Sequence, residues 1–215
     1  MTDAGDLDAG DFSTWLASIN GALRGEHGSD VPCGDCTACC TSSQFIHIEP
    51  DELDTLAKVP SELLFPAPRL PDGHVLMGYD ERGHCPMLVD DRCSIYEHRP
   101  RTCRVYDCRV FAASGINVQD SAKNRIANQV RRWVFRFPST EDAAEYRSVR
   151  AAATYLSDHE AELAEEFGVL SPIQRSLLSV QLYQMFLSRG VGAGQPRNTT
   201  PPLSAVRVEL RKKTI

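Results

Sequence analysis

The sequence predicts an α+β fold in which a small cysteine-rich core with a short β-meander packs against three C-terminal helices. All eight cysteines of the 215-residue chain lie within residues 33–108. Short apolar runs separated by turn residues fill residues 75–96, and stretches with helical periodicity fill most of residues 119–190. Because cysteines and helical stretches occupy different parts of the chain, we expect a cysteine-rich region followed by a helical one.

The first third of the chain predicts short elements joined by irregular segments. Residues 1–10 are acidic and rich in glycine, which is typical of a disordered tail. Apolar side chains recur at helical spacing in residues 12–23 and predict a short amphipathic helix. Residues 44–48 alternate as a strand does, and the proline and acids that begin residues 49–57 suit the first turn of a helix. The prolines of residues 60–74 argue against regular structure there.

The β-meander is predicted from three short runs rich in apolar residues. They are residues 75–77, 87–89 and 94–96. Asp90, Asp91 and Arg92 form the turn between the last two strands. Cys85 and Cys93 stand at the two ends of this hairpin, so we expect them to lie near each other across it.

Three helices are predicted in the C-terminal half. The first covers residues 119–136. Its apolar stripe consists of Ala122, Ile126, Val130 and Trp133. The second covers residues 139–167 and ends before Gly168. The third begins with Ser171 as the N-cap and stops at Gly190.

These elements divide the chain into four expected parts. Residues 1–30 form an N-terminal tail with the short helix, and residues 31–110 form the cysteine-cluster domain. Residues 111–190 form the helical region, and residues 191–215 form a linker with a basic tail. We interpret the basic tail as a solvated end, since a local run of Lys and Arg is usually exposed.

Charge and hydropathy restrict the classes of function. The chain has 23 Lys and Arg against 29 Asp and Glu, a net charge of −6, which argues against a nucleic-acid partner. The N-terminus has neither the positive charge nor the apolar run of a secretory signal, and no run of about 18 apolar residues predicts a membrane helix. We therefore expect a cytoplasmic protein that does not enter the membrane. In that reducing compartment, dense cysteines usually bind metal or carry out redox chemistry.

The cysteines are spaced as metal ligands are. Cys33, Cys36 and Cys39 repeat the Cys-x-x-Cys spacing, in which thiolates from one turn point at a common centre. Cys40 follows directly. Because adjacent side chains diverge, this doublet serves two centres or includes a thiol that is not a direct ligand. The other four are Cys85, Cys93, Cys103 and Cys108. Eight thiolates fill two four-cysteine sites, bridge a multinuclear centre, or fill one site and leave spare thiols, and the sequence leaves these partitions open.

The identity of the metal is not decided by the ligand type, since zinc and iron–sulfur clusters both accept four thiolates. The ferredoxin-like spacing, and Pro86 directly after Cys85, favour an iron–sulfur cluster of the 4Fe–4S type over zinc. Nearby guanidinium groups would offset the excess negative charge of several thiolates. The candidates are Arg99, Arg101, Arg104 and Arg109, of which Arg104 is the strongest. Weaker candidate ligands are His47, His84 and His98.

The cysteine pattern resembles the YkgJ-like cysteine-cluster family, which is described as a zinc- or iron-chelating domain. The resemblance covers about residues 31–110. It rests on Cys33-x2-Cys36-x2-Cys39-Cys40, Cys85-Pro86-Met87-Leu88, Cys93-Ser94-Ile95-Tyr96, and Arg99-Pro100-Arg101-Thr102-Cys103-Arg104 followed by Cys108. The resemblance implies that all eight cysteines belong to the chelating set.

Three functions are compatible with these observations. The first is a metal-binding protein with a redox or electron-transfer role. The second is a structural zinc protein that binds a partner protein through its C-terminal helices. The third is a cluster-dependent protein-modifying enzyme, which would need an open coordination site or a pocket beside the cysteines; no catalytic residue is identified for it.

Overall fold

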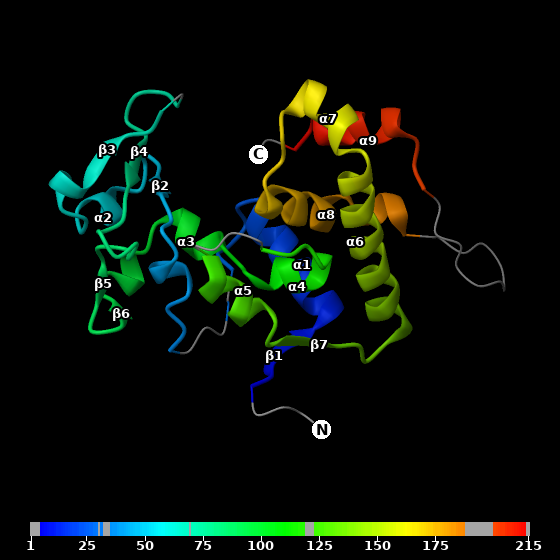
Figure 1. Ribbon diagram of the computed structural model, residues 1–215, viewed down its shortest axis with the longest axis horizontal. Coiled ribbons are helices and arrows are strands. Elements are labelled where there is room, and N and C mark those ends of the chain that lie inside the picture. Colours follow the sequence, from blue (N-terminus) through cyan, green and yellow to red (C-terminus); the bar gives the residue numbers. More distant parts are fainter. Residues whose placement is uncertain are drawn as a thin grey trace. The chain divides into compact units, whose positions relative to one another are not determined.

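A computed structural model describes residues 5–29, 31, 35–68, 70–118, 123–187 and 200–213 (Figure 1). The predicted α+β class is confirmed, because the chain combines helices with small sheets. Its internal contacts form two compact units. The cysteine-rich unit comprises Gly21–Asp107 and Gln119–Gln129, and the helical unit comprises Met1–Asn20, Cys108–Val118 and Val130–Ile215. The four-part division expected from the sequence stays a prediction.

The helical unit contains a parallel pair of strands that joins two distant segments. Strand β1 (Leu7–Asp11) pairs with β7 (Trp133–Arg136) (Figure 1). The prediction of disorder was therefore wrong for residues 7–10. The physical reason is that these residues pair with a strand more than a hundred residues later. Across this pair, the guanidinium group of Arg136 also forms exposed ion pairs with Asp8 at 2.9 Å and Asp11 at 2.8 Å. Asp8, one of the acidic residues that suggested a disordered tail, is thus paired across the strands.

Strand β7 also corrects the helix predicted over residues 119–136. The helix in this segment, α5, spans only Asn124–Val130, and Ala122 lies outside the described residues. Trp133 and Phe135 are buried, whereas the residue after each is exposed. This alternation is that of a strand with one buried face. Four alternating residues give only a weak strand signal, and the helical periodicity of the preceding residues led to the prediction of one continuous helix.

The remaining helices of the helical unit are largely those that the sequence predicts. Helix α1 (Phe12–Leu23) is confirmed, and α4 (Arg109–Ser114) was not predicted. The second predicted helix is interrupted at His159 and forms α6 (Thr140–Asp158) and α7 (Glu160–Phe167). The third, α8, spans Pro172–Phe186, and Gly190 lies outside the described residues. Capping boxes begin α6 and α8, as Ser139 pairs with Asp142 and Ser171 with Gln174.

The basic tail contains a packed helix instead of being entirely solvated. Helix α9 spans Leu203–Leu210, and Val206 and Leu210 are buried. They join the core formed by α6, α7 and α8. Its buried members are Ala152, Tyr155, Leu156, Leu163, Leu170, Leu178, Leu182, Phe186, Val206 and Leu210. The expectation of a solvated end fails because α9 has an apolar face that the run of charges obscures.

The cysteine-rich unit contains a three-stranded antiparallel sheet. Its strands are β2 (Ile46–Ile48), β3 (Leu64–Pro66) and β4 (Val75–Met77), in the order β2-β4-β3. Strand β3 lies in the proline-rich segment for which no regular structure was expected, and it follows a 3₁₀ turn at Ser61–Leu63. The sheet tolerates Pro66 because β3 is an edge strand. Helix α2 (Leu53–Leu56) follows β2, as predicted.

A separate two-stranded hairpin replaces the predicted meander. Strands β5 (Leu88–Val89) and β6 (Arg92–Cys93) pair with each other and not with β4. The turn is confirmed, since Asp90 and Asp91 both have left-handed backbones with φ of 49° and 57°. The expected third strand is wrong, because Tyr96–His98 form a 3₁₀ turn. Helix α3 (Arg101–Val105) follows and carries Cys103.

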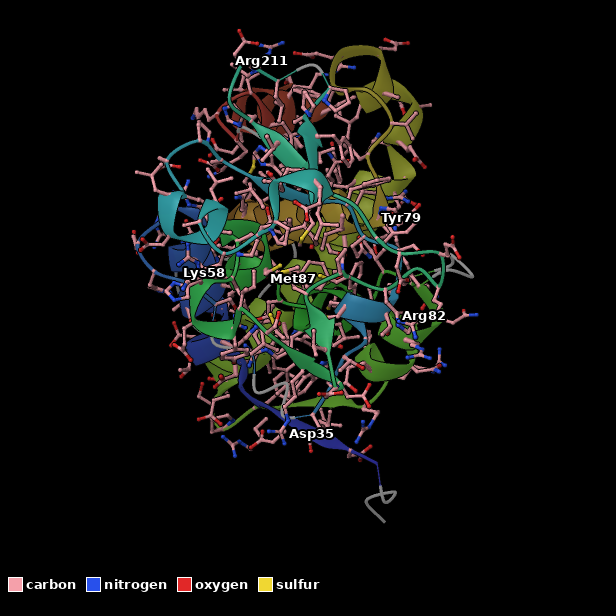
Figure 2. All side chains as sticks on the ribbon, turned by 90° about the vertical axis from the view of Figure 1, so that its left-hand side faces the viewer. Asp35, Lys58, Tyr79, Arg82, Met87 and Arg211 are labelled. Carbon is pink, nitrogen blue, oxygen red and sulfur yellow. The ribbon has the colours of Figure 1, made fainter. Side chains whose placement is uncertain are left out.

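The hairpin and the sheet share one small core. It contains Ile48, Val59, Met77, Met87 and Ile95, and Cys85 and Cys93 pack against it. Figure 2 labels Met87 on the face of this unit. Two of the candidate ligands therefore lie at the margin of an apolar core. No helix in the described parts of the chain is long and apolar enough to cross a bilayer.

Candidate metal centre

The seven cysteines that the structure describes are distributed over several elements. Six are half-buried: Cys36, Cys39, Cys40, Cys85, Cys93 and Cys103. Cys39 and Cys40 belong to a 3₁₀ turn, Cys39–Thr41, which follows the loop of Cys36. Cys108 is buried and belongs to the helical unit. Cys33 lies outside the described residues, so its expected role stays a prediction.

Backbone contacts bring the first cysteine segment to the hairpin. The amide of Cys85 donates a hydrogen bond to the carbonyl oxygen of Cys40 at 2.7 Å. Cys93 pairs with Leu88 across β5 and β6, and the Leu88 amide donates to the carbonyl of Cys85 at 2.9 Å. The expectation that Cys85 and Cys93 lie near each other is confirmed, because both contact Leu88 through the backbone and both pack against the same small core.

Cys103 joins this group from helix α3. Burial, together with the charges that Cys85, Cys40 and Cys93 would carry as thiolates, raises the pKa of its thiol to about 12. Such an effect places these three thiols within electrostatic range of Cys103. Four segments of the cysteine-rich unit therefore contribute one thiol each to a common region: the 3₁₀ turn, the loop before β5, strand β6 and helix α3.

These neighbours have the donor chemistry that a soft metal requires. Burial is also the main reason why the pKa of Cys85 is raised; the Met87 amide lowers it and Cys93 raises it. Without a cation, the thiols oppose each other's ionisation, so neutral thiols are favoured. A bound metal ion reverses this preference, because thiolates are its ligands and its charge offsets theirs. The residues therefore fit a thiolate-bound metal in their chemistry.

The positions of these thiols do not yet match those of metal ligands, although their chemistry does. Among the described residues, no three His, Cys, Asp or Glu side chains are arranged as a group that could hold a metal ion. Cys40, Cys85, Cys93 and Cys103 are thus neighbours without forming a complete ligand shell. Their side chains would need to adjust around an ion, and the roles of Cys36 and Cys39 stay predictions.

One of the four candidate arginines, Arg99, affects the ionisation of Cys103. Arg99 lowers the pKa of Cys103, and its guanidinium group lies 3.7 Å from the ring centroid of Tyr96. Arg104, the strongest candidate from the sequence, instead lies 3.6 Å from the Glu52 carboxylate. Arg101 forms ion pairs with Glu49 and Asp51. Arg109 donates to the carbonyl oxygen of Ala9, within the helical unit.

Glu52 is a positioning residue that the sequence indicated only as a helix-start acid. Its side chain is 2% exposed, and its carboxylate accepts hydrogen bonds from the backbone amides of Glu49 and Arg101. The Arg101 amide is the first of α3, where an unpaired donor would otherwise remain. Thr102 also donates to the carbonyl of His47 at 2.8 Å. These contacts hold the helix that carries Cys103 against β2 and α2.

Two other contacts concern predicted ligands. The indole Nε1 of Trp133 donates to the Cys108 sulfur at 3.2 Å, a contact that would also suit a thiolate ligand. His47 hydrogen bonds through Nε2 to Nδ1 of His74 at 2.9 Å, so this nitrogen already has a partner. No signal in the sequence indicated the pairing of His47 with His74.

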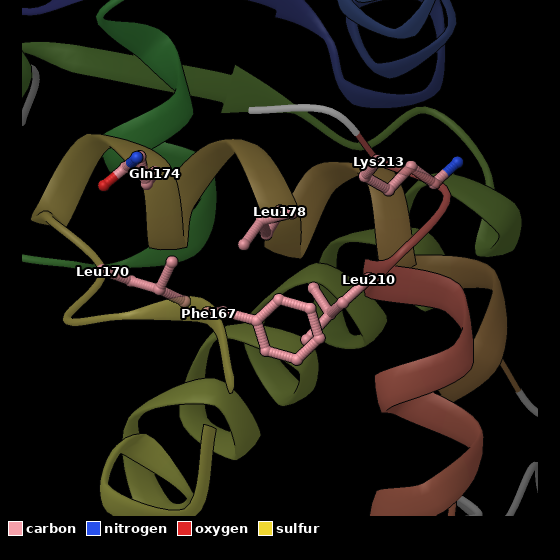
Figure 3. Close-up of a pocket in the computed structure, with 6 residues that line it drawn as sticks. All are labelled: Phe167, Leu170, Gln174, Leu178, Leu210 and Lys213. Carbon is pink, nitrogen blue, oxygen red and sulfur yellow. The ribbon is translucent and has the colours of Figure 1, made fainter. Parts of the chain in front are cut away.

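A described cavity belongs to the helical unit. Its volume is about 190 Å³ and its lining belongs entirely to the helical unit. It is lined by Phe167, Leu170, Gln174, Leu178, Leu210 and Lys213 (Figure 3). None of these is a cysteine or a histidine, so this cavity does not support the modifying-enzyme alternative.

Comparison with known proteins supports the chelating function. The family model CxxCxxCC, whose description is "Putative zinc- or iron-chelating domain", matches residues 32–129. No curated protein and no solved structure shows significant similarity to the chain. The match includes all eight cysteines and the elements that bring four of them together. Residues 32–129, just under half of the chain, therefore match the CxxCxxCC family, and this match supports metal binding by the domain.

Proposed function

We propose that this domain binds an iron–sulfur cluster of the 4Fe–4S type and that the protein transfers electrons or responds to oxidants. The observation that carries this proposal is the gathering of Cys40, Cys85, Cys93 and Cys103 from four segments of one unit. These four cysteines would hold the cluster, and the remaining cysteines would complete it or serve a second centre. The thiols belong to a cytoplasmic protein, where reducing conditions keep them available.

Iron is favoured over zinc by exposure and by local sequence. The six described thiols of the cysteine-rich unit are half-buried, so electrons have a short path between the centre and a partner. Cys85 is followed by Pro86, as a cysteine of a bacterial ferredoxin motif is. Eight cysteines also exceed what one structural zinc ion needs, since such an ion is closed by four ligands.

The chain's own residues would orient the ligands and adjust their charge. The Met87 amide and the Arg99 guanidinium group stabilise the thiolate forms of Cys85 and Cys103 respectively. Glu52 and Thr102 fix the start of α3 and therefore the position of Cys103. A bound cluster would supply reversible one-electron transfer.

Anaerobic purification tests the identity of the metal. We expect brown protein with visible absorption that bleaches on reduction, and iron and acid-labile sulfide in equal amounts. The matched control is the same protein purified in air and then treated with a chelator. A colourless protein that carries stoichiometric zinc and no labile sulfide would contradict the iron–sulfur proposal.

A structural zinc site is the second candidate. The hydrogen bonds of Glu52 and Thr102 connect α3, which carries Cys103, to β2 and to the start of α2. A structural zinc ion would stabilise the same arrangement. In this version the protein partner docks on the helical unit. Zinc-loaded protein with a midpoint of unfolding that falls on chelation, and with no redox activity, would favour this version.

A further inference from the structure

The three-stranded sheet of the cysteine-rich unit buries one face and exposes aromatic rings on the other. Ile48 and Met77 point into the core and are 0% and 1% exposed. Side chains alternate along a strand, so Phe65, next to the core-packed Leu64 in β3, points away from the core. The exposed rings are those of Phe45, Phe65 and Tyr79, which are 56%, 39% and 41% exposed. We call these three residues the aromatic face.

The rings of the aromatic face contact one another. The centroid of Phe45 lies 6.0 Å from that of Phe65, with the rings nearly perpendicular, and 5.0 Å from that of Tyr79. An added Cβ on Gly78 would lie 3.5 Å from the Phe65 ring and 3.9 Å from the Phe45 ring, so both rings reach over this bare position of the chain. The three side chains thus form one continuous apolar surface. Patches of this kind commonly mark interaction sites.

The segment that forms this face is strongly acidic. Residues 44–84 contain eight Asp and Glu against three Lys and Arg, a formal charge of −5, whereas the whole chain carries −6. Arg82 is one of the three cations and is paired with Asp80 at 3.0 Å. Figure 2 shows Tyr79 and Arg82 on the same side of the unit, away from Lys58. An anionic membrane, a nucleic acid or a second copy of the same face would meet like charge there.

A cation–π contact elsewhere in the unit shows which kind of side chain can bind an exposed aromatic ring. The guanidinium carbon of Arg99 lies 3.7 Å from the ring centroid of Tyr96. Within the described ranges, no Lys or Arg side chain covers a ring of the aromatic face in this way. A cation over an aromatic ring is attracted by the negative face of the ring. Although Glu49 and Asp51 are paired with Arg101 and Glu52 lies beside Arg104, the segment keeps a net negative charge, so a cation would be attracted by the rings and by this charge.

We propose that the aromatic face binds a Lys- or Arg-rich segment of a partner protein. The cationic side chains lie over Phe45, Phe65 and Tyr79, and the acidic residues of the same segment of the chain supply long-range attraction. The proposal rests on the sheet and its charge, and does not depend on which metal the domain binds.

Fluorescence anisotropy with the full chain tests the proposal. The probe is a short fluorescein-labelled peptide of alternating arginine and glycine, and the reference peptides replace arginine by glutamine or glutamate. We expect binding of the arginine peptide alone, and weaker binding as the salt concentration rises from about 0.05 to about 0.5 M. Equal affinity for the glutamine peptide would overturn the proposal in favour of apolar docking. Concentration-dependent dimers that fail to bind the arginine peptide would overturn it in favour of self-association.

Substitutions distinguish the contribution of the aromatic rings to peptide binding from that of the negative charge. Phe45→Leu and Phe65→Leu keep an apolar side chain, and each is expected to weaken peptide binding by about two- to fivefold. The matched control is Tyr96→Leu, because Tyr96 is similarly exposed at 55% but already contacts Arg99, and its affinity should not change. Unchanged affinity in both phenylalanine variants would show attraction by charge alone and would refute the role of the rings. Aromatic proton resonances of Phe45 and Phe65 in the unsubstituted protein give a second readout, since they should shift when the peptide is added.

Discussion

At Cys103, burial and three neighbouring thiols oppose ionisation together. Burial is the larger effect, the charges of Cys85, Cys40 and Cys93 add to it, and Arg99 partly offsets them. A thiol with a pKa of about 12 is almost wholly protonated at neutral pH. A metal ion at this position would therefore displace protons when it binds, and its apparent affinity should rise with pH.

Substitution of Cys103 tests whether the gathered thiols are ligands. We expect Cys103→Ser to lower the bound metal to less than half of its amount in the unsubstituted protein, because a hydroxyl is a poor substitute for a thiolate. The metal-loaded protein should also lose thermal stability, whereas the two metal-free proteins should differ little. Metal content and melting temperature are measured for both proteins, each with and without chelator. Full metal content in the variant would remove Cys103 from the ligand set.

The raised pKa of Cys103 also predicts how the stability of the metal-free protein depends on pH. The unfolded thiol ionises near its ordinary pKa of 9.0 and the folded thiol near 12. Between these values the unfolded state releases its proton first, so stability is retained below pH 9 and falls as the pH rises towards 12. Urea unfolding across this range measures the loss, and Cys103→Ser should show a smaller one. Equal losses in the two proteins would contradict the assignment to Cys103.

At the scale of elements, helix α3 is positioned by contacts from residues far away in the chain. Glu52 accepts from the Arg101 amide and Thr102 donates to the His47 carbonyl, so the helix is joined to two other elements at its first turn. Thr55 donates to the carbonyl of His98, just before that turn. Because α3 has only five residues, these contacts rather than its own hydrogen bonds set its place.

Loss of the Glu52 carboxylate should weaken this anchor. Glu52→Gln replaces one acceptor oxygen by a donor that faces the Arg101 or Glu49 amide, and we expect a loss of about 1–3 kcal/mol in the free energy of unfolding. Urea denaturation of the metal-free protein measures it. Glu97→Gln, on an exposed residue of the neighbouring 3₁₀ turn, is the control and should change stability little. A similar effect of both substitutions would show that the buried position of Glu52 is not the cause.

The predicted elements that hold are those whose signals are local. The capping boxes at Ser139 and Ser171, and the turn at Asp90 and Asp91, are encoded within a few residues of each other. The elements that sequence reasoning missed depend on distant partners. Strand β1 exists because it pairs with β7 more than a hundred residues later, and β3 exists as an edge of β4. Short strands have little intrinsic preference, so their partners decide them.

At the scale of the molecule, the contacts of the chain fall into two units, and the predicted ligands are unequally divided between them. Of the seven described cysteines, Cys108 alone belongs to the helical unit. Helices α8 and α9 contribute Leu178, Leu182, Phe186, Val206 and Leu210 to the core of that unit. Deletion of residues 170–215 would therefore disrupt this core, so a proposed partner site on the C-terminal helices requires surface substitutions instead.

The division into units predicts a local response to metal removal. We expect chelation to increase amide hydrogen exchange in residues 35–107, where the six half-buried thiols lie, and to change it little in α6 and α8. Mass spectrometry of the loaded and chelated protein measures exchange peptide by peptide. Equal increases in both units would contradict a metal centre confined to the cysteine-rich unit and would give Cys108 a larger share in it.

The sequence by itself determined the chemistry of this protein, because spacing and residue type suffice to identify a thiol-rich chelating segment, its family and its helix caps. The tertiary structure decided which thiols become neighbours, and it revealed the burial of Glu52 and the packed face of α9. The physical reason is that ligand type is a property of single side chains. Proximity and burial, by contrast, arise only when segments distant in the chain exclude water together.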